Sequence, residues 1–275
     1  MGDPMQTGDL INALILGIVE GLTEFLPVSS TGHLIAAGTF INFNPSYAKA
    51  FDVIIQFGAI AAVCWEFRSK IVSVVVGLPK RALARKFACN IVVTTIPAVT
   101  LALFFEKEIK AKLFSPLPVA IALIVGGVVI LMVERHVHDS PSTQPIVSMD
   151  AISYTTAFKV GLFQCLALIP GTSRSGATII GGMLVGLDRR VATEFSFFLA
   201  IPIIFGATLY EMSKSFHGLT FESFEVLALG LITAFISAFI CIRWLLRYVA
   251  SHDFTAFGWY RIVVGFLILT WFLAR

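Results

Sequence analysis

The sequence is poor in charged residues, which make up 13% of its 275 residues, whereas hydrophobic residues make up 57%. A soluble domain of this size carries about a quarter charged residues. The mean hydropathy of +0.88 agrees with this shortage of charge. The composition therefore predicts an integral membrane protein, with one domain over residues 1–275.

Several motifs are also missing. The four cysteines form no CxxC pair, which argues against a zinc site or a disulfide framework. Neither an HExxH motif nor a Walker-type phosphate loop occurs, so a zincin or an ATPase is not expected. The first residues lack a charged region followed by a cleavage site, so no removable signal peptide is expected. The basic cluster in 68–86 has no accompanying basic or aromatic domain, so no nucleic-acid partner is expected.

Long apolar runs are abundant instead. A transmembrane helix needs about 20 apolar residues to cross roughly 30 Å. Six segments meet this length approximately: 51–67, 87–105, 116–133, 191–211, 225–246 and 259–274. Two further apolar regions, 9–42 and 155–187, are interrupted by proline and glycine, among them Pro27, Gly32, Pro170 and Gly171. Such interrupted segments are typical of re-entrant hairpins, whose irregular backbone is tolerated only inside protein or beside water.

The two halves of the chain resemble each other. The sequence GIVEGL from Gly17 matches GLFQCL from Gly161, and the same spacing separates AKAFDVII from Ala48 and ATEFSFFL from Ala192. Each half then holds one hairpin and three spans, as repeats over 9–135 and 155–275. An odd number of spans makes the second half enter from the opposite side. The predicted fold is an all-α polytopic membrane protein with six transmembrane helices and two re-entrant hairpins in an inverted repeat.

Basic residues indicate the orientation of the spans. Arginines and lysines crowd the expected loop 68–86, which the positive-inside rule assigns to the cytoplasm. The expected loop 106–115 is then outside, and the stretch from Arg243 to Arg261 is inside. Both termini are then predicted to lie outside.

The second interrupted region contains Pro170–Thr178 (PGTSRSGAT), a loop of hydroxyls and glycines around Arg174. An arginine at membrane depth costs at least about 2.5 kcal/mol and is usually functional. Its donors match phosphate oxygens, and glycines let backbone N–H groups approach an anion at the start of a helix. We expect a phosphate to bind to Arg174 with Ser173, Ser175 and Thr178. The alternative, a packing motif of small residues, does not explain the arginine.

The first interrupted region carries two carboxylates, Glu20 and Glu24, which lie one turn apart on a helix. Neighbouring carboxylates at membrane depth require a divalent cation, a shared proton or a cationic partner. The alternative is a hydrated pair at an interfacial helix end.

The same region continues with the segment PVSSTGH, which contains Ser29, Ser30, Thr31 and His33. A hydroxyl nucleophile needs a neighbouring base, and histidine oriented by a carboxylate is the common solution. His33 could instead attack phosphorus itself. The alternative for Ser29 and Ser30 is helix capping, and for His33 a hydrogen-bonded histidine of the core.

The two motifs, Gly21–His33 and Pro170–Thr178, resemble the signature motifs of the bacterial undecaprenyl-pyrophosphate phosphatase family, also called the bacitracin-resistance protein family. The resemblance covers nearly the whole chain. It implies hydrolysis of the undecaprenyl diphosphate left after cell-wall polymerisation, in the bacterial plasma (inner) membrane. It also implies a divalent cation, Mg²⁺ or Ca²⁺, held by Glu20 and Glu24, and phosphate binding by Ser173, Arg174 and Thr178.

In the chemistry that this resemblance implies, Ser30 attacks the terminal phosphorus and is activated by His33 or Glu24. Ser30 is preferred narrowly over His33 as the nucleophile. Ser29, Thr31 and Ser175 add phosphate contacts. The active site is expected to face the outer side, where spent carrier diphosphate appears.

Two other functions compete with the phosphatase. Inverted repeats with broken helices are also a transporter architecture, so a transporter or flippase of the lipid carrier is the alternative. A structural scaffold leaves the buried charges unexplained. The expected partners are the polyprenyl diphosphate substrate and membrane lipids, and a homodimer is left open.

Overall fold

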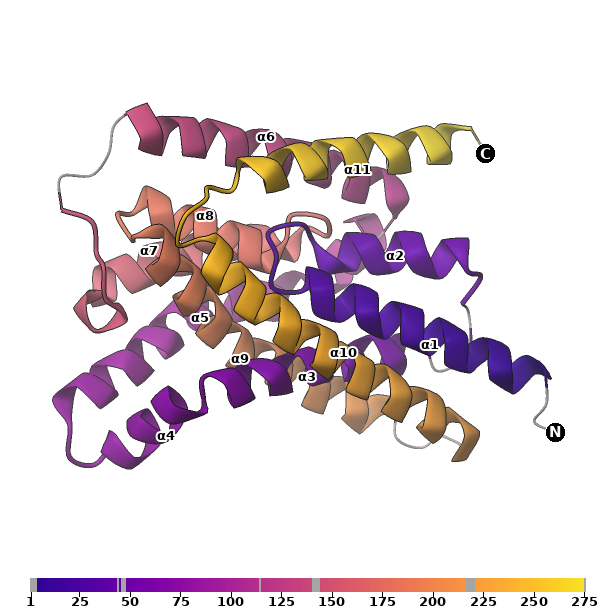
Figure 1. Ribbon diagram of the computed structural model, residues 1–275, viewed down its shortest axis with the longest axis horizontal. Helices are drawn as coiled ribbons and strands as arrows, with labels where there is room; N and C mark the ends of the chain where they lie inside the picture. Colours follow the sequence, from indigo (N-terminus) through magenta and orange to yellow (C-terminus); the bar gives the residue numbers. More distant parts are fainter. Residues whose placement is uncertain are drawn as a thin grey trace.

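The computed structural model describes residues 4–43, 45, 48–113, 115–139, 144–215 and 221–274 (Figure 1). Within these ranges the chain forms α-helices and two short 3-10 turns, and its only β-type pairing is one isolated bridge between Ile146 and Leu187. The all-α prediction is therefore confirmed.

The helices of the first half are α1 (Pro4–Thr23), α2 (Ser30–Phe40), α3 (Ala48–Glu66), α4 (Arg68–Gly77), α5 (Ala82–Leu113) and α6 (Pro116–Asp139). The second half holds the 3-10 turn η1 (Met149–Ala151), α7 (Tyr154–Gln164), the 3-10 turn η2 (Cys165–Leu168), α8 (Arg174–Leu184), α9 (Arg189–Ser215), α10 (Phe221–Tyr248) and α11 (Thr255–Leu273).

The six predicted spans coincide with helices α3, α5, α6, α9, α10 and α11. Five of them are long and apolar enough to cross a membrane on their own, and α3 qualifies together with α4, from which it is bent by 75°. The chain is therefore a multi-pass membrane protein.

Two segments that were predicted to be loops are largely helical in the structure. Residues 68–77 form α4, in which the mostly apolar segment Ile71–Val76 follows the basic residues Arg68 and Lys70. Helix α5 extends through most of 106–115, as far as Leu113, because alternating Glu and Lys residues are good helix formers. Charge alone marked these segments as loops, and charge does not exclude a helix.

Each interrupted region folds as two helices joined by a tight connection. In the first, α1 ends at Thr23 and α2 begins at Ser30; in the second, α7 and η2 lead through residues 169–173 into α8. Pro27 and Gly171 lie in the connections, but Gly32 lies inside α2, so its expected role as a helix breaker is wrong. Gly171 has φ of 94°, and a Cβ there would lie 2.5 Å from the carbonyl oxygen of Val119.

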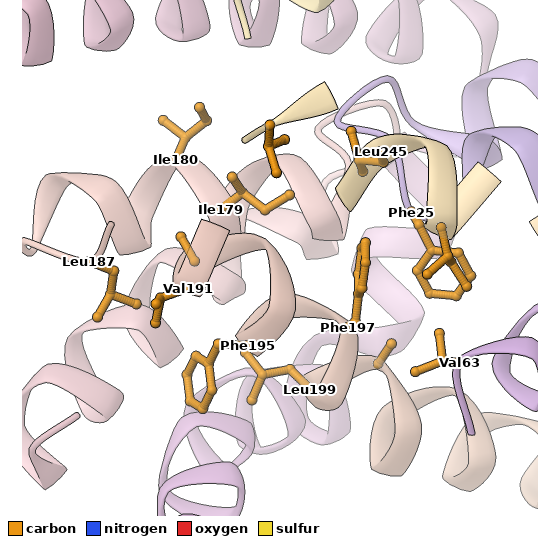
Figure 2. Close-up of a cluster of buried hydrophobic side chains, with 14 of the residues drawn as sticks. Phe25, Val63, Ile179, Ile180, Leu187, Val191, Phe195, Phe197, Leu199 and Leu245 are labelled. Atoms are coloured by element: carbon orange, nitrogen blue, oxygen red, sulfur yellow. The ribbon is translucent and has the colours of Figure 1, made fainter. Parts of the chain in front are cut away.

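A buried hydrophobic cluster holds both hairpins against α9. Figure 2 shows Phe195, Phe197 and Leu199 of α9 with Ile179 of α8 and Phe25 of the first connection. The rings of Phe25 and Phe197 pack edge to face, with centroids 5.2 Å apart. Because both hairpin tips pack against α9 in this cluster, they are fixed relative to each other.

The helix pairings are similar in the two halves. Helix α1 packs along α10, α7 packs along α5, and α6 packs along α11 (Figure 1). Glycines permit close approach in both hairpins: a Cβ on Gly17 would lie 2.6 Å from the Gly230 carbonyl oxygen, and one on Gly161 would lie 2.6 Å from that of Thr94. These pairings agree with two repeats, and the inverted repeat itself stays a prediction.

Candidate functional site

The connections of the two hairpins line one cavity of about 150 Å³. Its walls carry hydroxyls, one carboxylate, one amide and one guanidinium, and apolar residues complete them. The lining residues are Glu24, Ser29, Ser30 and Thr31 of the first hairpin, Gln56 of α3, Ala167, Ile169, Pro170, Gly171, Ser173 and Arg174 of the second hairpin, and Ile204 of α9. The structure thus brings together most of the side chains that the sequence selected.

Two helices begin at this cavity with the same local geometry. Ser29 caps α2 and accepts a hydrogen bond from the Gly32 amide at 3.4 Å, and Ser173 caps α8 and accepts one from the Gly176 amide at 3.0 Å. Both serines have positive φ, 72° and 74°, which is unusual for a residue other than glycine. Strained backbone of this kind clusters at ligand-binding sites. Two helix N-termini directed at one cavity favour an anion there.

Glu24 connects the two hairpins inside the cavity. Its Oε2 accepts a hydrogen bond from the Ser30 hydroxyl at 2.5 Å, and its Oε1 pairs with Arg174 Nη2 at 3.2 Å. The Glu24 side chain is 8% exposed and that of Arg174 is 12% exposed. Of the three partners considered for the carboxylate pair, Glu24 therefore has a cationic one.

Arg174 is held at both ends of its guanidinium. Nη1 donates to the carbonyl oxygen of Ser196 on α9 at 2.9 Å, while Nη2 pairs with Glu24. Its Nε is buried and has no hydrogen-bond partner among the described residues. An unpaired buried donor is costly, and an anion in the cavity would supply an acceptor.

Ser175 and Thr178 lie behind the cavity wall. The Ser175 hydroxyl donates to the carbonyl oxygen of Leu26 at 2.7 Å, which joins the two connections directly. The Thr178 hydroxyl lies 2.7 Å from the Ser196 hydroxyl on α9 and is almost fully buried. The structure therefore does not bring these two predicted phosphate contacts to the cavity surface, and it places them where they support Ser173 and Arg174.

His33 is directed away from the cavity. Its Nδ1 donates to the Ser29 carbonyl oxygen at 2.8 Å, and its Nε2 accepts from the Tyr260 hydroxyl at 2.7 Å. Its ring is stacked on that of Tyr260. With both ring nitrogens engaged, His33 fixes the backbone next to Ser30, and Glu24 is the group in contact with the Ser30 hydroxyl.

Glu20 lies next to this network but does not line the cavity. It is fully buried and within electrostatic reach of Glu24, Asp52 and Arg174. Neither of its carboxylate oxygens has a hydrogen-bond partner among the described residues. Buried carboxylate oxygens without donors next to a second carboxylate fit the oxygen ligands that Mg²⁺ and Ca²⁺ prefer.

One further arginine, Arg261, supports the two hairpin connections that line the cavity. Arg261 of α11 is 1% exposed. Its five N–H groups reach five main-chain carbonyl oxygens, two on α6 and three in the hairpin connections. These belong to Ala122, Leu123, Pro27, Gly171 and Thr172, at 2.8 to 3.3 Å. Arg261 therefore holds both connections against α6.

Comparison with known proteins agrees with this site. A family model described as bacitracin resistance protein BacA matches residues 13–267. The chain belongs to this family. The protein named undecaprenyl-diphosphatase 1 from Burkholderia cenocepacia (strain HI2424) is 65% identical over 260 residues, 94% of each chain. Its namesake from Burkholderia ambifaria is 64% identical with the same coverage, and the undecaprenyl-diphosphatase of Burkholderia mallei (strain SAVP1) is 63% identical, again over 94% of each chain.

The part of the chain that matches the BacA family includes the whole cavity and Arg261. Arg261 was not among the predicted site residues and was placed only at the end of the stretch expected inside, whereas it lies buried within α11. The signal was present, since it is a single arginine in the apolar segment 259–274 and the argument used for Arg174 applies to it. Ser196 and Tyr260 were missed, although Ser196 lies in the repeat segment ATEFSFFL, because their partners at the site, Arg174 and His33, come from other helices.

Proposed function

We propose that this protein hydrolyses undecaprenyl diphosphate to undecaprenyl phosphate and inorganic phosphate. The observation that carries the proposal is the contact between the Ser30 hydroxyl and Glu24, beside Arg174, in a cavity where two helices begin. Membership of the BacA family and the printed names of the relatives support the same activity. The reaction would recycle a lipid carrier for peptidoglycan synthesis, and a larger supply of recycled carrier accounts for resistance to bacitracin.

The cavity is suited to a terminal phosphoryl group. Phosphoryl transfer depends mainly on positioning and on stabilising negative charge in the transition state. Arg174 supplies positive charge and an unpaired Nε–H donor. Ser29, Thr31 and Ser173 line the same cavity and add hydroxyls, and the starts of α2 and α8 add positive helix ends.

In the proposed reaction, Ser30 Oγ attacks the terminal phosphorus and its proton passes to Glu24 Oε2. The bond from phosphorus to the bridging oxygen breaks, and undecaprenyl phosphate leaves with the electron pair. Water then attacks the phosphoserine, the bond from phosphorus to Ser30 Oγ breaks, and Glu24 returns its proton to Oγ, which releases inorganic phosphate and restores both the Ser30 hydroxyl and the Glu24 carboxylate. Glu24 takes the proton because it is the base in contact with Ser30, whereas His33 bonds to Ser29 and Tyr260.

Glu20 and Glu24 would hold the divalent cation that the family resemblance implies. The unpaired oxygens of Glu20 support this assignment. When bound, such a cation neutralises charge on diphosphate oxygens.

We place the protein in the bacterial inner membrane with the cavity open to the outer side. The support is the positive-inside pattern and the chemistry of the carrier, whose diphosphate form is produced outside. A homodimer stays a prediction. No observation on the described residues favours the transporter alternative. A transporter needs no hydroxyl nucleophile in contact with a base, such as Ser30 with Glu24.

The test is phosphate release from undecaprenyl diphosphate by the purified protein in detergent. We expect turnover by the wild type and none above background by Ser30→Ala, which removes the nucleophile and little volume. Absence of turnover by a folded wild type, with and without Mg²⁺ or Ca²⁺, would refute the phosphatase. A fully active Ser30→Ala variant would refute the proposed role of Ser30.

A further inference from the structure

Two apolar grooves lie along α6, one on each side. The first, here called the α6–α8 groove, has a volume of about 530 Å³ between α6 and the second hairpin. Its walls include Leu117, Ile121 and Val125 of α6, Leu166 of η2, and Ala177 and Leu184 of α8. The second, here called the α2–α11 groove, has a volume of about 520 Å³ between α2, α6 and α11.

Of the two grooves, only the α6–α8 groove shares a lining residue with the cavity. Ile169 lines both spaces and is 40% exposed. Its neighbours alternate between them, since Leu166 and Thr172 line the groove whereas Ala167 and Ser173 line the cavity. The wall between groove and cavity is therefore a single stretch of chain. The α2–α11 groove shares no lining residue with the cavity.

We propose that the α6–α8 groove binds the polyprenyl tail of the substrate while the diphosphate occupies the cavity. This inference rests on the proposed function. A cavity of about 150 Å³ has room for a phosphoryl group but not for a long polyprenyl chain, so the tail must leave it. The α6–α8 groove has apolar walls and meets the cavity at Ile169, so it offers the tail a path out of the cavity.

The chemistry of the groove fits an isoprenoid and no polar ligand. Thr172 and Arg261 supply its polar side chains, and all five N–H groups of Arg261 already bind carbonyl oxygens. Ile121, Val125 and Leu184 are 49%, 55% and 44% exposed, so the groove opens on the apolar surface of the protein. A tail in this groove stays in contact with lipid along its length and need not be extracted from the membrane.

Photo-crosslinking tests the inference without requiring turnover. The probe is a polyprenyl diphosphate with a diazirine in its tail, added to the full-length protein in detergent. We expect labelled peptides from α6 and from η2–α8, and competition by undecaprenyl phosphate but not by phospholipid. Labelling confined to α2 and α11, no labelling, or equal competition by phospholipid would overturn the groove assignment.

Two substitutions sharpen the test. Val125→Trp fills the α6–α8 groove from an exposed position, and Ala36→Phe fills the α2–α11 groove as the matched control. We expect Val125→Trp to abolish the α6 and α8 labelling and to lower kcat/KM for undecaprenyl diphosphate about tenfold or more, relative to farnesyl diphosphate. Equal effects of the two variants, or equal loss for both substrates, would contradict the inference. Labelling in the groove by a protein that releases no phosphate would refute the proposed function alone.

Discussion

Glu24 is the residue on which the proposed chemistry depends most. Its two carboxylate oxygens have separate partners, the Ser30 hydroxyl and the Arg174 guanidinium. Such a group can accept a proton from the nucleophile while it orients the phosphate-binding side chain. The sequence identified Glu24, Ser30 and Arg174 because charge and hydroxyls are rare in apolar segments. It did not assign the base, because the direction of the His33 ring depends on Tyr260, which is distant in the sequence.

Replacing Glu24 tests this dual role. Glu24→Gln keeps the shape but removes the negative charge and most of the basicity. We expect kcat to fall by about a hundred- to ten-thousand-fold, the range that general bases contribute. The measurement is phosphate release from undecaprenyl diphosphate. The matched control is Glu194→Gln, which removes the partner of Arg190, whose side chain is 63% exposed, and should leave kcat within about twofold. A Glu24→Gln enzyme as active as this control would exclude Glu24 as the base.

At the scale of elements, Arg261 holds both hairpin connections against α6. Arg261→Lys keeps the charge but has three N–H donors for five carbonyl oxygens. Each carbonyl left without a partner costs about 1–3 kcal/mol, so we expect a lower thermal midpoint in detergent and a lower kcat. Arg243→Lys on α10 is the control, since its ion pair with Glu66 is half exposed and should tolerate the change. Equal midpoints for the two variants would show that Arg261 is not a structural support.

Glycines set the distance between the hairpins and the long helices. Gly161→Ala places a Cβ 2.6 Å from the carbonyl oxygen of Thr94 on α5, and neither backbone can move without disturbing α7. We expect a loss of about 1–3 kcal/mol, as for overpacked cores. Gly206→Ala on α9 is the control because nothing lies within 4 Å of its added Cβ. Thermal denaturation of both variants compares them, and an unchanged midpoint for Gly161→Ala would contradict close packing of α7 on α5.

The elements themselves were largely predictable from the sequence. Apolar runs located six helices, and proline with glycine located both hairpins. Helix α4 and the end of α5 were not predicted, because Arg68, Lys70 and the Glu–Lys residues after 105 marked loops by charge alone. Helix preference and positive charge are compatible at a membrane surface, so charge does not identify a loop there. The pairing of α1 with α10 and of α7 with α5 depends on which glycine faces which carbonyl, and no local pattern records that.

At the scale of the whole molecule, the basic residues before α5 predict the orientation in the membrane. We expect Lys80→Cys to be inside and Ser115→Cys to be outside, in a variant whose native cysteines are replaced by alanine. A membrane-impermeant maleimide should label Ser115→Cys on intact cells and Lys80→Cys only after permeabilisation. The reverse pattern would invert the orientation and place the cavity on the cytoplasmic side.

The central claim is that two hairpins, one with the nucleophile and one with the phosphate-binding arginine, form a single hydrolytic cavity. Quenching with SDS at neutral pH, which preserves both phosphoserine and phosphohistidine, during turnover of undecaprenyl diphosphate labelled in its terminal phosphate, followed by mass spectrometry of the protein, tests it most directly. The account predicts phosphate on Ser30 in the wild type and none in Arg174→Ala, which cannot hold the terminal phosphoryl group. Phosphate on His33, or on neither residue, would contradict it.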